Sequence, residues 1–173
     1  MSDIGCPIFI MKIEYPFIPK SSRSLRPGDF WGFKLKNDTW ACGRILQLPS
    51  SGRNSRMWLF GALLDWNGEN APTSESIANA KALRQGAMHI DAIRKTGLQV
   101  IANRPLEADQ LEPWLCISGD KVQRGYVYVR PWKREDTDKL PTFSYWGDLF
   151  IWMLANHHFS GVSPADDEFP SLP

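Results

Sequence analysis

The stretch RMWLFGALLDW, residues 56–66, constrains the fold more than any other part of the sequence. Successive residues of a β-strand point to opposite faces of a sheet. In this stretch apolar side chains fill both faces, with Met57, Leu59 and Leu63 on one and Trp58, Phe60 and Leu64 on the other. A strand of this kind needs cover on both sides, so the pattern predicts a central strand buried between two layers.

A half-buried strand is expected upstream. A Pro-Gly-Asp turn at residues 27–29 precedes the segment FWGFKLK, residues 30–36. Trp31, Phe33 and Leu35 share one face of this segment, whereas the alternate positions carry glycine and two lysines. Such alternation is typical of a strand with one buried face. Trp31 is therefore expected in the core.

The next segment completes a hairpin. Asn37 and Asp38 form a short polar break and tolerate left-handed backbone conformations. The sequence TWACGRILQL, residues 39–48, is again extended in character. Two extended segments around a short polar break predict a β-hairpin. Because Trp40 shares its face with a mixed set of residues, we expect its indole to be partly exposed.

Two short helices are expected in the middle of the chain. Ser74 precedes a series of apolar residues that stops at Gly86, which predicts a short helix with Ser74 as its cap. A one-turn helix is expected to end at Gly97, with a strand before it and another over residues 98–102.

A longer helix is expected near the C-terminus, within SYWGDLFIWMLANHHFSG, residues 144–161. Large apolar side chains recur there at helical spacing: Trp146, Leu149, Phe150, Met153 and Leu154. Gly161 follows, in a position that commonly ends a helix. The pattern predicts an amphipathic C-terminal helix.

The segment EPWLCISGDKVQRGYVYVRPW, residues 112–132, predicts two strands around a turn at residues 119–120. In the second strand, strict alternation would put four residues on one face: Arg124, Tyr126, Tyr128 and Arg130. Tyrosine and arginine are frequent at protein interfaces and also stack on nucleic-acid bases. The alternative is that the tyrosines pack beneath the C-terminal helix while the arginines extend outward.

Short, regularly spaced strands with one packing helix predict an α+β fold. We expect a strongly bent antiparallel β-sheet, a short helix mid-chain and a C-terminal amphipathic helix packed on the sheet. Residues 1–25 are expected to form an N-terminal arm that can add one edge strand, and residues 26–160 a single domain. The acidic, proline-rich residues 161–173 are expected to be disordered.

Composition narrows the classes of function. The chain has 20 basic and 19 acidic residues, so no global field draws it to nucleic acid or to an anionic membrane. Its three cysteines have no CxxC spacing, which disfavours a disulfide framework or a zinc site and favours the cytoplasm. The apolar run near the N-terminus is interrupted by prolines and Glu14, so neither a signal peptide nor a membrane span is expected.

No catalytic motif is recognisable. The sequence lacks the G-x-G-x-x-G, Walker, H-E-x-x-H and G-x-S-x-G patterns. Adjacent His157 and His158 would point about 100° apart on a helix and cannot easily share a metal. Cys42 and Cys116 lie among apolar neighbours, as buried structural thiols do. We therefore expect no catalytic residue, no metal and no cofactor.

Two surfaces are candidates for binding a partner. The first combines the partly exposed Trp40 with the arginine and tyrosine residues at positions 124–130. The second is acidic and could meet a basic protein surface by charge complementarity; it comprises Glu135, Asp136 and Asp138.

Several segments together resemble immunity protein 26, a bacterial family found beside polymorphic toxins. The resemblance covers roughly residues 24–132: LRPGDFWGFKLKNDTWACGRIL, MWLFGALLDW, IRKTGLQVIANRPL and YVYVRPW. It implies a cytoplasmic inhibitor that binds a cognate toxin domain and blocks its active site or substrate channel. It implies no catalytic residues and gives no interface positions.

Two other functions remain open. One is a nucleic-acid-binding β domain that uses the same arginine and tyrosine residues, although the balanced charge disfavours it. The other is an enzyme with a cysteine or aspartate at a strand end as its reactive group, which would require a markedly lowered thiol pKa at Cys42 or Cys116.

Overall fold

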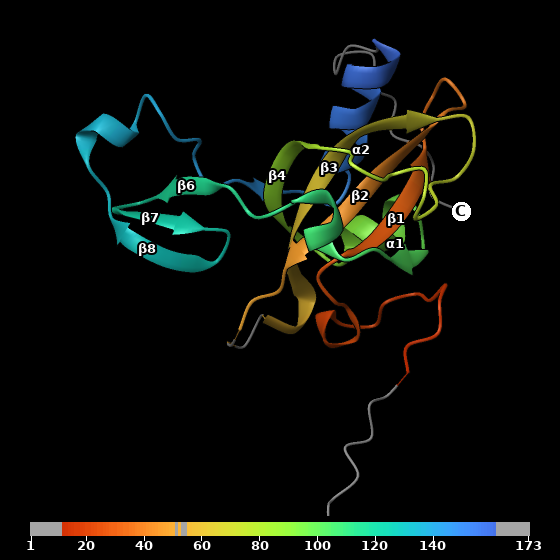
Figure 1. Cartoon of the computed structure of the whole chain (residues 1–173), viewed down its shortest axis with the longest axis horizontal. Helices are drawn as coiled ribbons and strands as arrows, with labels where there is room; N and C mark the ends of the chain where they lie inside the picture. Colours follow the sequence, from red (N-terminus) through yellow and green to blue (C-terminus); the bar gives the residue numbers. More distant parts are fainter. Residues whose placement is uncertain (1–11, 51, 53–54, 162–173) are drawn as a thin grey trace, which may run out of the picture.

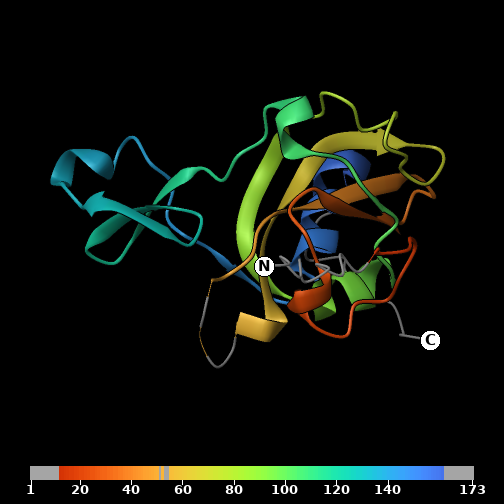
Figure 2. The same ribbon diagram turned by 60° about the horizontal axis from the view of Figure 1, so that its bottom comes forward.

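The computed structural model describes residues 12–50, 52 and 55–161 of the 173-residue chain. In this part of the chain, nine strands form a six-stranded sheet of order β5-β1-β2-β3-β4-β9 and a three-stranded sheet of order β6-β7-β8. Figures 1 and 2 show the smaller sheet projecting to one side of the larger one. The predicted α+β class is confirmed.

The larger sheet contains β1 (Asp29–Lys34), β2 (Trp40–Gln47), β3 (Trp58–Gly68), β4 (Ala82–His89), β5 (Ala102–Asn103) and β9 (Tyr145–Trp146). The smaller sheet contains β6 (Leu115–Ser118), β7 (Lys121–Arg124) and β8 (Val127–Pro131). The helices are α1 (Asp91–Thr96) and α2 (Phe150–Ala155), which continues into the π-helical turn η5 (Asn156–Ser160). Short 3-10 turns are η1 (Ser22–Ser24), η2 (Ser55–Met57), η3 (Leu106–Asp109) and η4 (Arg134–Asp136).

The central strand is β3, as its two apolar faces predict. It pairs antiparallel with β2 on one side and with β4 on the other. Leu59 and Leu63 enter the core on one face of the sheet, together with Trp31 and residues of α1 and α2. Phe60 and Leu64 enter a second core on the opposite face.

The hairpin of β1 and β2 is also confirmed, with Trp31 fully buried and Trp40 partly exposed. Burial of β1 is wider than the alternation predicts, because Asp29 through Phe33 are all buried. Gly32 accounts for part of this difference. A Cβ at Gly32 would collide with the ring of Pro72, so the loop after β3 covers the face predicted to be exposed.

The helix predicted from Ser74 to Gly86 is wrong. Residues 74–79 form turns, and β4 begins at Ala82, so the strand expected before the one-turn helix is present and starts earlier than predicted. Strand β3 has a second edge whose backbone groups need partners, and β4 supplies them. Gly86 does not end a helix but lies within this strand, where the indole of Trp146 occupies the space that a Cβ would fill. Tertiary pairing therefore outweighs the local helical pattern.

The short helix before Gly97 is confirmed as α1. The strand predicted over residues 98–102 is wrong in its bounds, because β5 is Ala102–Asn103 and Leu98 has a left-handed backbone with φ +71°. In the described residues of the N-terminal arm, 12–25, the expected edge strand is reduced to a bridge between Phe17 and Val100. Residues 161–173 were predicted to be disordered, and those from 162 on lie outside the described residues.

The C-terminal helix is present but shorter than predicted. Trp146 belongs to β9, which pairs parallel with β4, and α2 begins only at Phe150. Its buried residues are Ile151, Trp152 and Ala155 rather than those of the predicted stripe. Gly161 ends the helical segment in a left-handed conformation, as expected.

The smaller sheet differs from the prediction in one decisive respect. The segment RGYVYVR is not a single strand, because β7 ends at Arg124 and β8 begins at Val127. Gly125 has φ +57° and opens the tight turn between them, a position that favours glycine. The alternation continues through this turn in the sequence, but the chain reverses direction there.

Candidate functional site

The projecting sheet is attached to the larger sheet through Tyr126. Its ring lies 5.8 Å from that of Phe60 and 5.9 Å from that of Phe143, measured between centroids. Its hydroxyl donates a hydrogen bond of 3.1 Å to the carbonyl oxygen of Leu59. Burial raises the pKa of this hydroxyl, so Tyr126 stays neutral. Tyr126 is therefore a support for the sheet.

Two glutamines complete the attachment. The side-chain oxygen of Gln47, at the end of β2, accepts a hydrogen bond of 2.6 Å from the backbone N–H of Tyr126. Gln85, on β4, accepts one of 2.8 Å from the backbone N–H of Trp114 and donates one of 3.0 Å to the carbonyl of Glu112. These bonds fix both the hairpin turn and the chain that enters β6.

The two edges of the projecting sheet have different surroundings. The edge at β6 is covered, because Ile117 exchanges backbone hydrogen bonds with the segment 141–143. The edge at β8 borders no other strand among the described residues. Val127, Tyr128 and Val129 are 56%, 57% and 46% exposed, so both faces of β8 are open to solvent. Several large apolar side chains exposed along one edge strand are typical of an interaction site.

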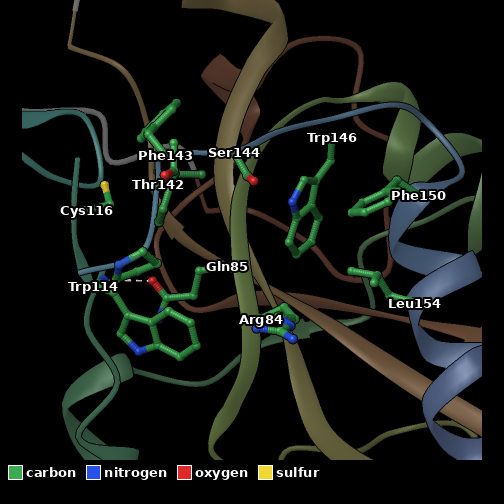
Figure 3. Close-up of a pocket in the computed structure, with 12 residues that line it drawn as sticks. Arg84, Gln85, Trp114, Cys116, Thr142, Phe143, Ser144, Trp146, Phe150 and Leu154 are labelled. Carbon is green, nitrogen blue, oxygen red and sulfur yellow. Dashed lines mark hydrogen bonds between the residues drawn. The ribbon is translucent and has the colours of Figure 1, made fainter. Parts of the chain in front are cut away.

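A pocket of about 330 Å³ lies where the projecting sheet meets the larger one. Figure 3 shows Arg84 in it, between Trp114 on one side and Trp146 and Phe150 on the other. The lining residues are Phe60, Arg84, Gln85, Trp114, Cys116, Pro141, Thr142, Phe143, Ser144, Trp146, Phe150 and Leu154. The pocket is thus aromatic, with one charged side chain in its lining.

The structure separates the four residues that were predicted to share a strand face. Arg124 pairs with Glu112 at 2.9 Å and donates a hydrogen bond to the carbonyl of Pro113. Tyr126 is half-buried, whereas Tyr128 is exposed. The predicted continuous face of arginine and tyrosine is therefore wrong, because the turn at Gly125 interrupts it.

Arg130 and Asp136 were predicted to belong to two separate binding surfaces, but they form an ion pair with each other. The guanidinium donates to both carboxylate oxygens, at 2.6 and 2.8 Å, and Asp136 is buried. The hydrogen bond from Arg130 lowers the pKa of Asp136 to about 2. Glu135 and Asp138 remain exposed on either side of it. Of the three predicted acidic contacts, Asp136 is thus already occupied within the chain.

Trp40 lies away from this region. It begins β2, opposite Gly68 of β3, whereas Gln47 at the other end of the same strand contacts the projecting sheet. The structure therefore does not bring Trp40 together with the residues of positions 124–130. Arg84 and Trp114 were missed from the sequence, because residue 84 fell in a predicted helix and no periodicity marked residue 114.

Among the described residues, the groups that could act as nucleophiles or metal ligands are either buried or already paired within the chain. Burial raises the pKa of both described cysteine thiols, Cys42 and Cys116, so neither is activated as a nucleophile. His89, Asp91 and Asp148 lie close enough to share a metal ion. However, Arg94 pairs with Asp91 and Lys95 pairs with Asp148, so both carboxylates already have cationic partners.

A comparison with known protein families matches residues 26–128 to immunity protein 26, more than half of the chain. The chain belongs to the immunity protein 26 family. The resemblance predicted from the sequence is confirmed, and it places the chain among the immunity proteins of toxin–immunity systems. Neither the search of curated proteins nor the search of solved structures gives a match.

The immunity protein 26 match begins at the turn before β1 and ends at Tyr128 in β8. It includes Arg84 and Trp114, whereas the opposite wall of the pocket, from β9 and α2, follows the matched region. The pocket therefore combines the family region with the C-terminal segment of this chain. No helix in the described ranges is both long and apolar enough to span a membrane.

Proposed function

We propose that this protein binds a cognate toxin domain in the cytoplasm and neutralises it by blocking its active site or substrate channel, without catalysis of its own. The observation that carries the proposal is the open, apolar strand β8 on a sheet that projects from the domain. Family membership supplies the class of partner.

The exposed side chains of the projecting sheet suit a protein partner. Aromatic and β-branched residues bury much apolar surface on association and lose little side-chain entropy. Tyr128 and Trp132 are 57% and 40% exposed and lie on or directly after β8. Arg124, Glu135 and Asp138 are solvent-accessible charged residues close to them in the sequence, and charged residues of this kind form the polar rim of an interface.

The remaining predicted contacts take different roles in this proposal. Tyr126 anchors the sheet, and the ion pair of Arg130 and Asp136 holds the segment after β8 in place. These residues support the surface rather than form its centre. Trp40 lies at the other end of β2 and would belong to a separate contact.

A titration tests the proposal. The purified protein is titrated calorimetrically with the toxin domain encoded directly upstream, and the mixture is analysed by co-elution. We expect one-to-one binding with a Kd near nanomolar, equivalent to about −12 kcal/mol at 25 °C. Absence of heat and separate elution would refute the pairing.

A matched pair of variants tests the surface. Tyr128→Ala is expected to weaken toxin binding at least about tenfold, because a central aromatic contact is lost. Leu98→Ala is the control, since Leu98 is an apolar side chain of nearly the same exposure, 56%, outside the projecting sheet. Equal affinities of the two variants would exclude β8 as the contact.

A further inference from the structure

We propose that the aromatic pocket beside β4 receives a carboxylate side chain of the toxin, an aspartate or glutamate, and that Arg84 is its partner. The inference rests on the proposed function and names one contact within it. It adds the positive charge of Arg84, an exposed side chain that is flanked by the aromatic lining of the pocket.

The fold directs Arg84 into the pocket. Arg84 and Gly86 are two residues apart on β4 and therefore share a face of the strand. The indole of Trp146 lies against Gly86 on this face, and both Arg84 and Trp146 line the pocket. Strand β9 pairs with β4 only at Ala87 and Met88, so it leaves the part of β4 around Arg84 uncovered.

The charge of Arg84 has no counterpart in the described part of the structure. No acceptor there hydrogen-bonds its guanidinium, and the lining of the pocket includes no acidic side chain. Arg124 and Arg130, the arginines of the neighbouring sheet, are by contrast each paired with a carboxylate of this chain. A guanidinium pairs best with a planar, anionic oxygen group, because its fork of N–H donors matches a carboxylate.

The walls of the pocket would strengthen such a pair. Trp114 and Phe150 are 37% and 40% exposed at opposite sides of it, so a bound partner would cover both and exclude water from Arg84. Charge interactions increase when water is excluded. The hydroxyls of Thr142 and Ser144, also in the lining, are further donors for a carboxylate oxygen.

The size of the pocket favours one side chain over a nucleic-acid strand. A volume of about 330 Å³ holds a carboxylate side chain together with an apolar neighbour. Nucleic-acid binding depends on many cations that track the phosphates, whereas the lining here offers Arg84 as its single cation. The chemistry therefore favours an acidic residue of a protein.

The test compares Arg84→Gln with Arg23→Gln in the titration against the upstream-encoded toxin domain. Arg23 is an exposed arginine on η1 outside the pocket lining, so its variant controls for loss of one positive charge. We expect Arg84→Gln to raise the Kd at least about tenfold with an unchanged unfolding midpoint, and Arg23→Gln to leave the Kd within about twofold. Toxin binding that is unaffected by Arg84→Gln overturns the inference and leaves the proposed function standing.

A double-mutant cycle identifies the occupant. Each acidic residue of the toxin domain is replaced by its amide and titrated against the wild-type protein and against Arg84→Gln. One toxin acid is expected to lose its effect in the Arg84→Gln background. Additivity at every acidic position overturns the carboxylate assignment. The carboxylate assignment is also overturned if the wild-type protein binds a single-stranded oligonucleotide and Arg84→Gln abolishes that binding. If the wild-type protein does not bind the toxin domain, both this inference and the proposed function are overturned.

Discussion

The two sheets of this protein differ in how much of their surface they bury. In β2 every residue from Ala41 to Leu46 is buried, including Arg44, whose charge is balanced inside the domain. In β8 every residue is exposed or half-buried. The larger sheet therefore contains most of the core, whereas β8 of the projecting sheet leaves its apolar side chains exposed to solvent.

The comparison also explains why the smaller sheet needs its attachments. Three short strands without a second layer are marginally stable by themselves. Hydrogen bonds made by Tyr126, Gln47 and Gln85 join this sheet to β2, β3 and β4. These bonds restrict the movement of the smaller sheet relative to the larger one. A surface that is held rigid before binding loses less entropy when the partner arrives.

The largest expected effect concerns the buried charges of the larger sheet. Asp109 accepts hydrogen bonds from Arg44 at 2.7 Å and from Arg104 at 2.8 Å. Asp109→Ala leaves the fully buried Arg44 without its carboxylate, which should lower the free energy of unfolding by about 3–5 kcal/mol. Chemical denaturation measures this loss. Glu107→Ala, an exposed acid in the same turn, is the control, and equal stability of the two variants would contradict the assigned role.

A smaller effect is expected at the junction of the two sheets. Tyr126→Phe keeps the ring among Phe60 and Phe143 but removes the hydrogen bond to Leu59. The free energy of unfolding should fall by about 1 kcal/mol. Tyr128→Phe removes an exposed hydroxyl and should change nothing measurable. Hydrogen exchange of the β7 and β8 amides would show whether the loss loosens the projecting sheet.

The larger sheet was largely predictable from the sequence because its pattern is local. The two apolar faces of β3 and the alternation around Trp31 gave strands that the structure contains. A strand was expected directly before α1, but the first part of β4 was assigned to a helix, because Ala82 and Leu83 continue a helical pattern when read alone. Only the demand of β3 for a second hydrogen-bonded neighbour makes residues 82–89 a strand.

The candidate site was far less predictable. A two-residue turn at Gly125 preserves the period of two in the sequence while reversing the chain, so the pattern of residues 124–130 imitated one strand. The pocket is built by Arg84, Trp114 and Trp146 from three distant segments, whose meeting depends on tertiary structure. Tyr128 was predicted as a contact from the alternation of residues 124–130, and the structure shows it exposed.

The ion pair between Arg130 of β8 and Asp136 predicts a pH dependence of stability that is confined to acidic pH. The pKa of Asp136 is lowered to about 2 in the folded protein, against about 3.9 for an unfolded aspartate. Its contribution to stability is therefore present above about pH 4 and is lost as the pH falls toward 2. Asp136→Asn should remove this part of the acid dependence in denaturation measured from pH 6 to pH 2, whereas the exposed Asp138→Asn should retain it.

The smallest expected effect gives the sharpest contrast between the two sheets. The side chain of Tyr128 is exposed and makes no hydrogen bond within the described part of the chain, so Tyr128→Ala should change the free energy of unfolding by no more than about 0.5 kcal/mol. The buried Trp31 on β1 behaves oppositely, because Trp31→Ala opens a cavity in the core and should cost about 3–5 kcal/mol. Thermal and chemical denaturation of both variants measure this difference in the free energy of unfolding. A large destabilisation by Tyr128→Ala would show that β8 is part of the structural core, and its apolar residues would then no longer point to a partner.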